Sequence, residues 1–459
     1  MRNKKNIIYL LVFIFFVFLV SFVANHHENW SDEAQAWLLA RDSSTIELLT
    51  KYLRCEGHPI IWYLIIKIFI LLKLPYESFN LISVIFSSLG VFIFLFKSRF
   101  EWYIKVLFPF TFFVFYQFSV ISRAYCMILL ILSILASIWE KRENHYLLFT
   151  ILLIIMINLE IYTYLLAGSI FLLELIDYIK DKKNRNKGKM IYFVIIFLSF
   201  FLTLLYLLPQ TNTYVPINQL VFRFSKAFIL PYNISDNISL IVDFFLISYL
   251  LIVLSKKNEL FRIIIMILPV ILFMIVYYFN VWHYGILFLF FIIIIWINKL
   301  ENTKSIMVLI IISCIIQIRW SINSSINEVN KVYSSSNEVA SFIKKYDYKN
   351  LYVFGYKFEA VAVNAYFPKN IYRNWTLNKG FFSFDLKNES YFSFDIKDIT
   401  YDINADIIVC EKKKDSHINN NLKNYDKYMF PNNYIFQTKK IATKNNYIVY
   451  VKKGLKTIS

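Results

Sequence analysis

The chain has 459 residues, of which 58% are hydrophobic and 19% aromatic, and its formal net charge is +18. A soluble protein of this size cannot bury so much apolar surface, because its core grows only as its surface allows. The basic residues lie mostly in short stretches between apolar segments, where Lys and Arg orient membrane proteins and meet anionic headgroups. We therefore expect a lipid bilayer as a partner and no nucleic acid.

Apolar segments recur from residue 7 to about residue 320, with lengths suited to helices that cross a hydrocarbon core of roughly 30 Å. Lys4 and Lys5 precede the first segment, but no small-residue cleavage site follows it, which favours an uncleaved span over a signal peptide. We expect an all-α polytopic bundle of about eleven spans. They are 7–24, 77–96, 106–121, 123–139, 146–159, 162–179, 190–208, 237–254, 263–279, 285–298 and 305–320.

The charges of the connecting loops predict the topology. All the basic stretches fall on one side of the membrane if the N-terminus is cytoplasmic, as the positive-inside rule requires. This holds only if the apolar segment 59–74, which has Lys67 near its middle, does not cross. We interpret it as an interfacial helix within the first outer loop, 25–76, and the alternative is a short span with a snorkelling lysine. The segments 106–139 and 146–179 are interpreted as tight hairpins with polar residues at the outer mouth.

The composition changes at about residue 321, where Asn, Lys, Ser, Asp and Tyr become frequent and the apolar runs shorten to the length of strands. We expect strands at Leu351–Tyr356, Ile407–Cys410 and Tyr447–Val451 and a helix at Asn337–Lys345. The chain would thus consist of a membrane domain, 1–320, and a small extracytoplasmic α/β domain, 321–459. The expected location is the cell membrane, with several passes.

An acidic pair, Asp32 and Glu33, stands out in the first outer loop. It precedes the helix-forming run Ala34–Ala40, so both carboxylates lie at a helix N-terminus, where the helix dipole favours negative charge. The residues by themselves fit simple capping as well as they fit a catalytic pair.

The surrounding pattern distinguishes these readings. The run DEAQAWLLARD, followed by EGHPIIWYLIIK, resembles the first-loop signature of GT-C membrane glycosyltransferases. The likeness is to the branch of protein O-mannosyltransferases and aminoarabinose transferases. In that family an acidic pair follows the first span and a His-Pro motif, here His58-Pro59, opens a juxtamembrane helix. The resemblance is strong over roughly residues 25–65.

Elsewhere the resemblance is weaker, and the chain departs from the family at two places. Ser122-Arg123-Ala124-Tyr125 is similar to an Arg-containing outer loop, and Trp282-His283-Tyr284-Gly285 lies at the outer end of a late span. Ile60 stands where the family often has a second proline. A histidine common in relatives is replaced around Glu160-Ile161-Tyr162, which puts the acceptor side of the site in doubt.

The resemblance implies inverting transfer of a sugar from a polyprenyl-phosphate donor to a glycan, lipid or protein acceptor of the cell envelope. Asp32 would accept the proton of the acceptor, and Glu33 would position the base or the acceptor. Arg123 and Lys67 would contact the lipid phosphate. His58, His283 and Glu160 are further candidates for substrate binding, although capping, an aromatic belt and a loop tip explain them nearly as well.

The sequence predicts no cofactor. His26, His27 and Glu28 could attract a divalent metal, but the resembled branch works without one. The cysteines Cys55, Cys126, Cys314 and Cys410 show neither a disulfide framework nor metal-ligand spacing.

Two alternative functions remain open. A transporter or flippase of lipid-linked glycans would also be helical and basic, but it would place ionisable residues near the middle of the membrane. A catalytically inactive relative that serves as a membrane scaffold is the other alternative.

Overall fold

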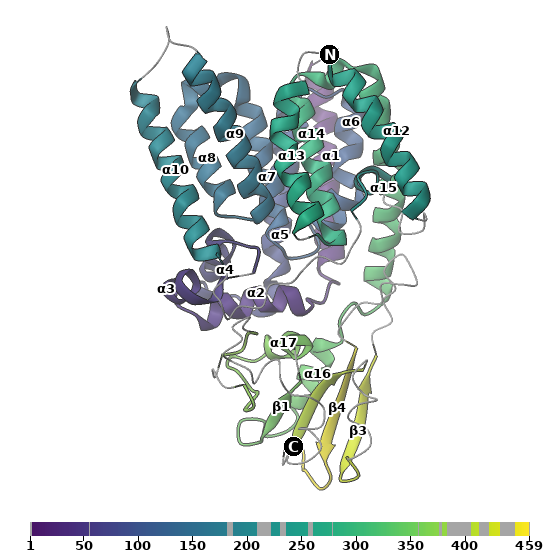
Figure 1. The fold of residues 1–459 in the computed structure, drawn as a ribbon. Helices are drawn as coiled ribbons and strands as arrows, with labels where there is room; N and C mark the ends of the chain where they lie inside the picture. Colours follow the sequence, from purple (N-terminus) through teal and green to yellow (C-terminus); the bar gives the residue numbers. More distant parts are fainter. Residues whose placement is uncertain are drawn as a thin grey trace.

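The computed structural model describes residues 2–54, 56–180, 187–208, 222–229, 236–255, 260–277, 279–356, 358–375, 379–382, 405–412, 422–431 and 446–458. The protein is mostly helical, at 71%. A helical bundle carries a small sheet domain at one end, and the N-terminus lies at the opposite end of the bundle (Figure 1).

Ten longer helices make up the bundle in the described part of the chain. They are α1 (Arg2–Ala24), α5 (Asn80–Lys97), α7 (Tyr125–Ile138), α8 (Tyr146–Ile157), α9 (Ile161–Lys180), α10 (Lys187–Leu207), α12 (Asp236–Ser255), α13 (Leu260–Val276), α14 (Tyr284–Ile297) and α15 (Lys304–Asn330). Every residue of α14 is buried, as expected for a helix that is apolar on all sides. Helices α1, α10 and α12 instead expose large apolar side chains such as Phe18, Phe197 and Phe244, which suit contact with lipid.

Six helices in the described residues are long and apolar enough to cross a membrane, by length and composition. The expectation of about eleven spans is therefore not confirmed. Helices α7 and α14 have 14 residues each and α8 has 12, fewer than the roughly 20 that a full crossing needs. The expected span 106–121 is not one helix: it is divided among α6 (Trp102–Leu107), η3 (Phe108–Phe110) and η4 (Phe112–Gln117). Pro109, which lacks a backbone N–H donor, lies at this break.

The remaining short elements connect the longer helices. They are α3 (Thr45–Glu47), η1 (Leu48–Tyr52), η2 (Tyr76–Ser78), η5 (Trp139–His145), α11 (Lys226–Ile229), η6 (Val281–His283) and η7 (Leu300–Asn302).

The first long loop folds onto the end of the bundle that faces the sheet domain. It contains α2 (Ser31–Asp42) and α4 (Ile60–Leu71), and α4 packs against α2 (Figure 1). With 12 residues, α4 is about 18 Å long, which is too short to cross a hydrocarbon core of roughly 30 Å. The turn between α8 and α9 reaches the same place: Ile61 N donates to Asn158 O at 3.0 Å, and Ile161 N donates to Gly57 O at 3.1 Å.

The C-terminal domain contains a four-stranded sheet in the order β1-β2-β4-β3. Strand β1 (Val353–Gly355) is parallel to β2 (Ile407–Glu411), and β4 (Tyr447–Lys452) is antiparallel to both β2 and β3 (Tyr425–Phe430). The helices α16 (Ser336–Ile343) and α17 (Val361–Asn364) and the turn η8 (Phe358–Ala360) complete the domain. The expected boundary at 320 falls inside α15, which continues to Asn330.

The C-terminal domain is docked on α2. The side-chain amide of Gln35 pairs with both backbone groups of Phe382, at 2.8 Å and 2.7 Å. Gly380 N donates to the Asp42 carboxylate at 2.7 Å, and Arg41 donates to Phe367 O at 2.5 Å. The helix that carries the acidic pair is therefore held between the bundle and the sheet domain.

Candidate functional site

Glu33 is fully buried at the start of α2 and accepts hydrogen bonds from three groups. Trp30 N donates to it at 3.0 Å, which completes a capping box, and Ser122 N donates at 2.5 Å. The third donor is His27 Nε2, at 3.0 Å. The expectation of capping at the N-terminus thus fits Glu33, which in addition fixes the 122–123 turn against α2.

A buried chain of polar groups extends from Glu33 into α15. His27 Nδ1 donates to Glu328 at 2.9 Å, and Tyr116 OH donates to the other oxygen of Glu328 at 2.5 Å. Burial by itself lowers the pKa of His27, but the two carboxylates outweigh it and raise this pKa to about 10. His27 is therefore an imidazolium between two buried carboxylates. The partner Glu328 could not be predicted from the sequence, because 301 positions separate it from His27.

Asp32, the neighbour of Glu33, has a different environment. Its side chain is 32% exposed, and its carboxylate lies 3.5 Å from Nη1 of Arg123. Arg123 itself is 18% exposed, and its Nη2 donates to His58 Nε2 at 2.8 Å. Three residues that the sequence singled out, from α2, the loop before α4 and the turn before α7, are thus joined around one guanidinium.

The geometry assigns the tautomer of His58. Arginine only donates, so Nε2 of His58 is the acceptor and Nδ1 carries the hydrogen. Burial lowers the pKa of His58 well below its usual value, and the nearby Arg123 lowers it further, so the ring is neutral. Nδ1 is buried and has no hydrogen-bond partner among the described residues. A buried donor without a partner costs about 1–3 kcal/mol, which a ligand oxygen would relieve.

Glu160 and His283 lie within the electrostatic reach of Arg123. Burial raises the pKa of Glu160 to about 8, although the N–H groups of Tyr162 and Thr163 and the charge of Arg123 oppose this shift. Burial, with a contribution from Arg123, lowers the pKa of His283 to about 3. Nδ1 of His283 accepts from Asn280 N and from Tyr162 OH, each at 2.9 Å. Both groups are mainly neutral at pH 7 and can serve as hydrogen-bonding groups rather than charges.

A further carboxyl group borders the cluster. Glu56 accepts from Gln35 Nε2 at 2.9 Å, and burial raises its pKa to about 7 while Gln35 and Arg123 lower it. Glu56 was not among the residues predicted for the site. Through Gln35 this carboxyl group is linked to Phe382 of the C-terminal domain.

Lys67 is not part of the cluster around Arg123. Its ammonium donates to Ala40 O at 2.8 Å and also to Ser43 O, so it binds the last carbonyls of α2. The other six candidates are brought together at one end of the bundle, whereas Lys67 stabilises the far end of the helix that carries the acidic pair.

No group of three His, Cys, Asp or Glu side chains in the described ranges could hold a metal ion. In the sequence His26-His27-Glu28, Nδ1 of His26 donates to Phe22 O at 2.8 Å. His27 binds the carboxylates of Glu33 and Glu328.

Comparisons of the chain with protein-family models, with curated proteins and with solved structures find no match. The functional assignment therefore rests on the residues of this chain and on their arrangement.

Proposed function

We propose that the protein is a membrane glycosyltransferase that takes a sugar from a polyprenyl-phosphate donor. The observation that carries the proposal is the cluster of Asp32, Arg123 and His58. In it a partly exposed carboxylate and a cation meet an N–H donor that has no partner within the described ranges. The bundle end that bears this cluster is also the end on which α4 and the sheet domain lie (Figure 1).

Asp32 is the proposed general base. In an inverting transfer, the acceptor oxygen attacks the anomeric carbon while the bond from that carbon to the phosphate oxygen breaks. The acceptor proton passes to Asp32, and the bonding electron pair leaves with the lipid phosphate. Asp32 suits this role better than Glu33, because Glu33 has its oxygens occupied by buried donors whereas Asp32 reaches solvent.

Arg123 and His58 are the proposed phosphate contacts. A guanidinium neutralises the charge that develops on the departing phosphate, and the Nδ1–H of His58 can donate to a phosphate oxygen. Since Arg123 also contacts Asp32, a phosphate bound to it would place the anomeric carbon near the base.

The proposal predicts that Asp32→Asn loses sugar transfer. The amide keeps the size of the side chain but cannot accept a proton, and the loss of a positioned general base typically costs about 10²–10⁴-fold in rate. The measurement is transfer from a radiolabelled polyprenyl-monophosphate hexose to envelope acceptors by the purified protein in nanodiscs. Asp426→Asn, an exposed residue of β3, is the matched control and should retain full activity. An unchanged rate for Asp32→Asn would reject Asp32 as the base.

A further inference from the structure

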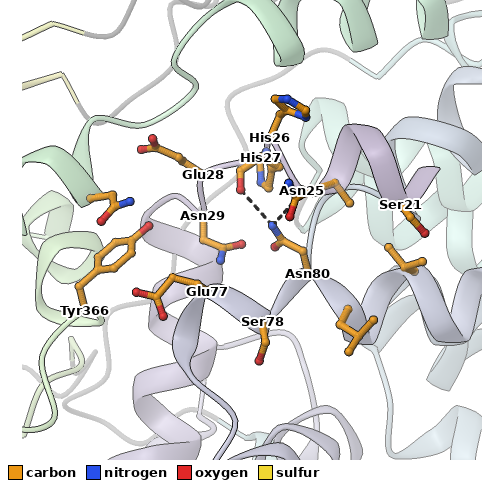
Figure 2. A pocket seen from close by; sticks show the side chains of 14 residues that line it. Ser21, Asn25, His26, His27, Glu28, Asn29, Glu77, Ser78, Asn80 and Tyr366 are labelled. Atoms are coloured by element: carbon orange, nitrogen blue, oxygen red, sulfur yellow. Dashed lines mark hydrogen bonds between the residues drawn. The ribbon is translucent and has the colours of Figure 1, made fainter. Parts of the chain in front are cut away.

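A cavity of about 390 Å³ opens beside the buried His27, where the outer end of α1, the start of α5 and the C-terminal domain meet. Figure 2 shows its polar lining: Glu28 and Asn29 from the first loop, Glu77 from η2 and Tyr366 from the C-terminal domain. Asn25, Asn80 and Asn337 also line it. The residues proposed to contact the donor or to act as the base, Arg123, His58 and Asp32, do not line this cavity.

Two of the residues that line the cavity each carry a polar atom without a hydrogen-bond partner in the described part of the chain. The Oδ1 of Asn29, a residue that is only 2% exposed, and the Oε2 of Glu28 are buried without a hydrogen bond to any described residue. In Figure 2 the Asn29 amide lies among the lining side chains, between Glu77 and Asn80. Burying such groups without partners is unfavourable, so they indicate a ligand that donates hydrogen bonds.

The charges of the cavity restrict the ligand. Glu28 and Glu77 are both close enough to the Tyr366 hydroxyl to raise its pKa, although burial of that hydroxyl is the larger cause. The carboxylate of Glu77 disfavours a phosphate, and burial raises the pKa of Glu28 to about 7, so that its carboxyl group is only partly charged at neutral pH. The described residues provide no metal-binding group. Amides, carboxyl groups and a tyrosine, which together donate and accept hydrogen bonds, suit the vicinal hydroxyls of a sugar.

The cavity lies close to Asp32, the proposed base that accepts the proton of the acceptor. Asn29 precedes Asp32 by three residues, so their Cα atoms lie within about 11 Å of each other. His27 lines the cavity and also binds Glu33, the neighbour of Asp32. The cavity is acidic, whereas the proposed phosphate contacts are cationic or neutral.

We propose that this cavity binds the saccharide part of the acceptor, through hydrogen bonds from its hydroxyls to Glu28, Asn29 and Glu77. This inference rests on the proposed function and assigns to that function a glycan-bearing acceptor.

The test is ligand-observed saturation-transfer NMR on the full-length protein in nanodiscs, with EDTA present and no donor. The probes are the methyl glycosides of glucose, galactose, mannose and N-acetylglucosamine. At least one of them should bind the wild type saturably, and inorganic phosphate should not compete. Glu77→Gln, and independently Asn29→Ala, should weaken that binding about tenfold. Glu77→Gln replaces a charged acceptor oxygen by an NH2 donor, and Asn29→Ala removes the amide.

Glu101→Gln is the matched control, since Glu101 precedes α6 and does not line the cavity; its binding should equal that of the wild type. Asp32→Asn should also bind normally, which separates this proposal from the catalytic one. Failure of all four glycosides to bind the wild type, or unchanged binding in both cavity variants, would overturn the acceptor subsite. Loss of transfer activity alone would not.

Discussion

At the scale of single residues, Asp32 and Glu33 are adjacent in sequence but differ in environment. Glu33 is enclosed by three donors, two from the loop before α2 and one from the 122–123 turn, whereas Asp32 is partly exposed and lies 3.5 Å from the guanidinium of Arg123. The sequence predicted the pair but could not distinguish its members, because the difference arises from Ser122 and His27 packing on Glu33. His58 and Lys67 differ in the same way: Nδ1 of His58 has no partner among the residues that the structure describes, whereas the ammonium of Lys67 donates to Ala40 O.

His27 should be essential for stability. His27→Gln removes the cation between two buried carboxylates, and breaking a buried ion pair in this way costs about 3–5 kcal/mol. The raised pKa means that the folded state holds the proton more tightly than the unfolded state. The contribution of His27 is therefore complete below pH 6.5 and is lost as the pH rises through about 10.

The measurement is the apparent melting temperature of the purified protein in detergent, as a function of pH. His26→Gln, at the exposed neighbouring residue, is the control and should melt like the wild type. Equal melting temperatures for His27→Gln and the wild type would contradict the buried ion-pair network.

At the scale of secondary-structure elements, the short helix α4 was predictable from the sequence, and its packing against α2 was not. The length of the apolar segment and the loop charges predicted a helix near 59–74, and α4 occupies Ile60–Leu71. Lys67 binds the end of α2 because α2 and α4 pack against each other. The spacing of apolar residues in the sequence does not predict this packing.

The strands β1, β2 and β4 were predicted because each forms a short apolar run, and in the structure they are buried. Strand β3 was missed, because it is an edge strand whose central residues are exposed and include Asp426 and Lys427.

Lys67→Met should lower the stability of the protein by about 1 kcal/mol, because a cation at a helix C-terminus satisfies carbonyls and interacts with the helix dipole. Its effect on the KM for the lipid-linked donor should be small. Lys73→Met, just beyond α4 and exposed, is the control for the change in charge. The readouts are the melting temperature and the donor KM. A large rise in KM with unchanged melting would restore Lys67 as a phosphate contact.

At the scale of the whole molecule, composition predicted a helical membrane protein, and the structure has apolar helices and a small C-terminal sheet domain. The number of spans was not predictable from apolar runs alone, because segments such as 106–121 are broken and α7, α8 and α14 are short. The assembly of the candidate site is also a property of the whole molecule. It combines turns from the first loop, two hairpins and η6, and a single sequence carries no information about such distant contacts.

The proposed topology predicts opposite accessibility for the two ends of α5. Lys73→Cys, before α5, should react with a membrane-impermeant maleimide added outside intact cells. Lys97→Cys, at the end of α5, should react only after permeabilisation, because the basic loops are expected in the cytoplasm. Labelling of the wild type provides the background. External labelling of Lys97→Cys would refute both the cytoplasmic N-terminus and the interpretation of α4 as an interfacial helix that does not cross the membrane.

The central claim is that the protein cleaves a lipid-linked sugar rather than moving it. The most direct measurement follows a radiolabelled polyprenyl-monophosphate hexose in proteoliposomes that contain the wild-type protein and extracted envelope acceptors. If the protein is a transferase, the label leaves the lipid fraction, free polyprenyl phosphate accumulates in equal amount, and Asp32→Asn prevents both. Label that crosses to the other leaflet on an intact lipid carrier, equally in wild type and Asp32→Asn, would contradict the account and indicate a flippase.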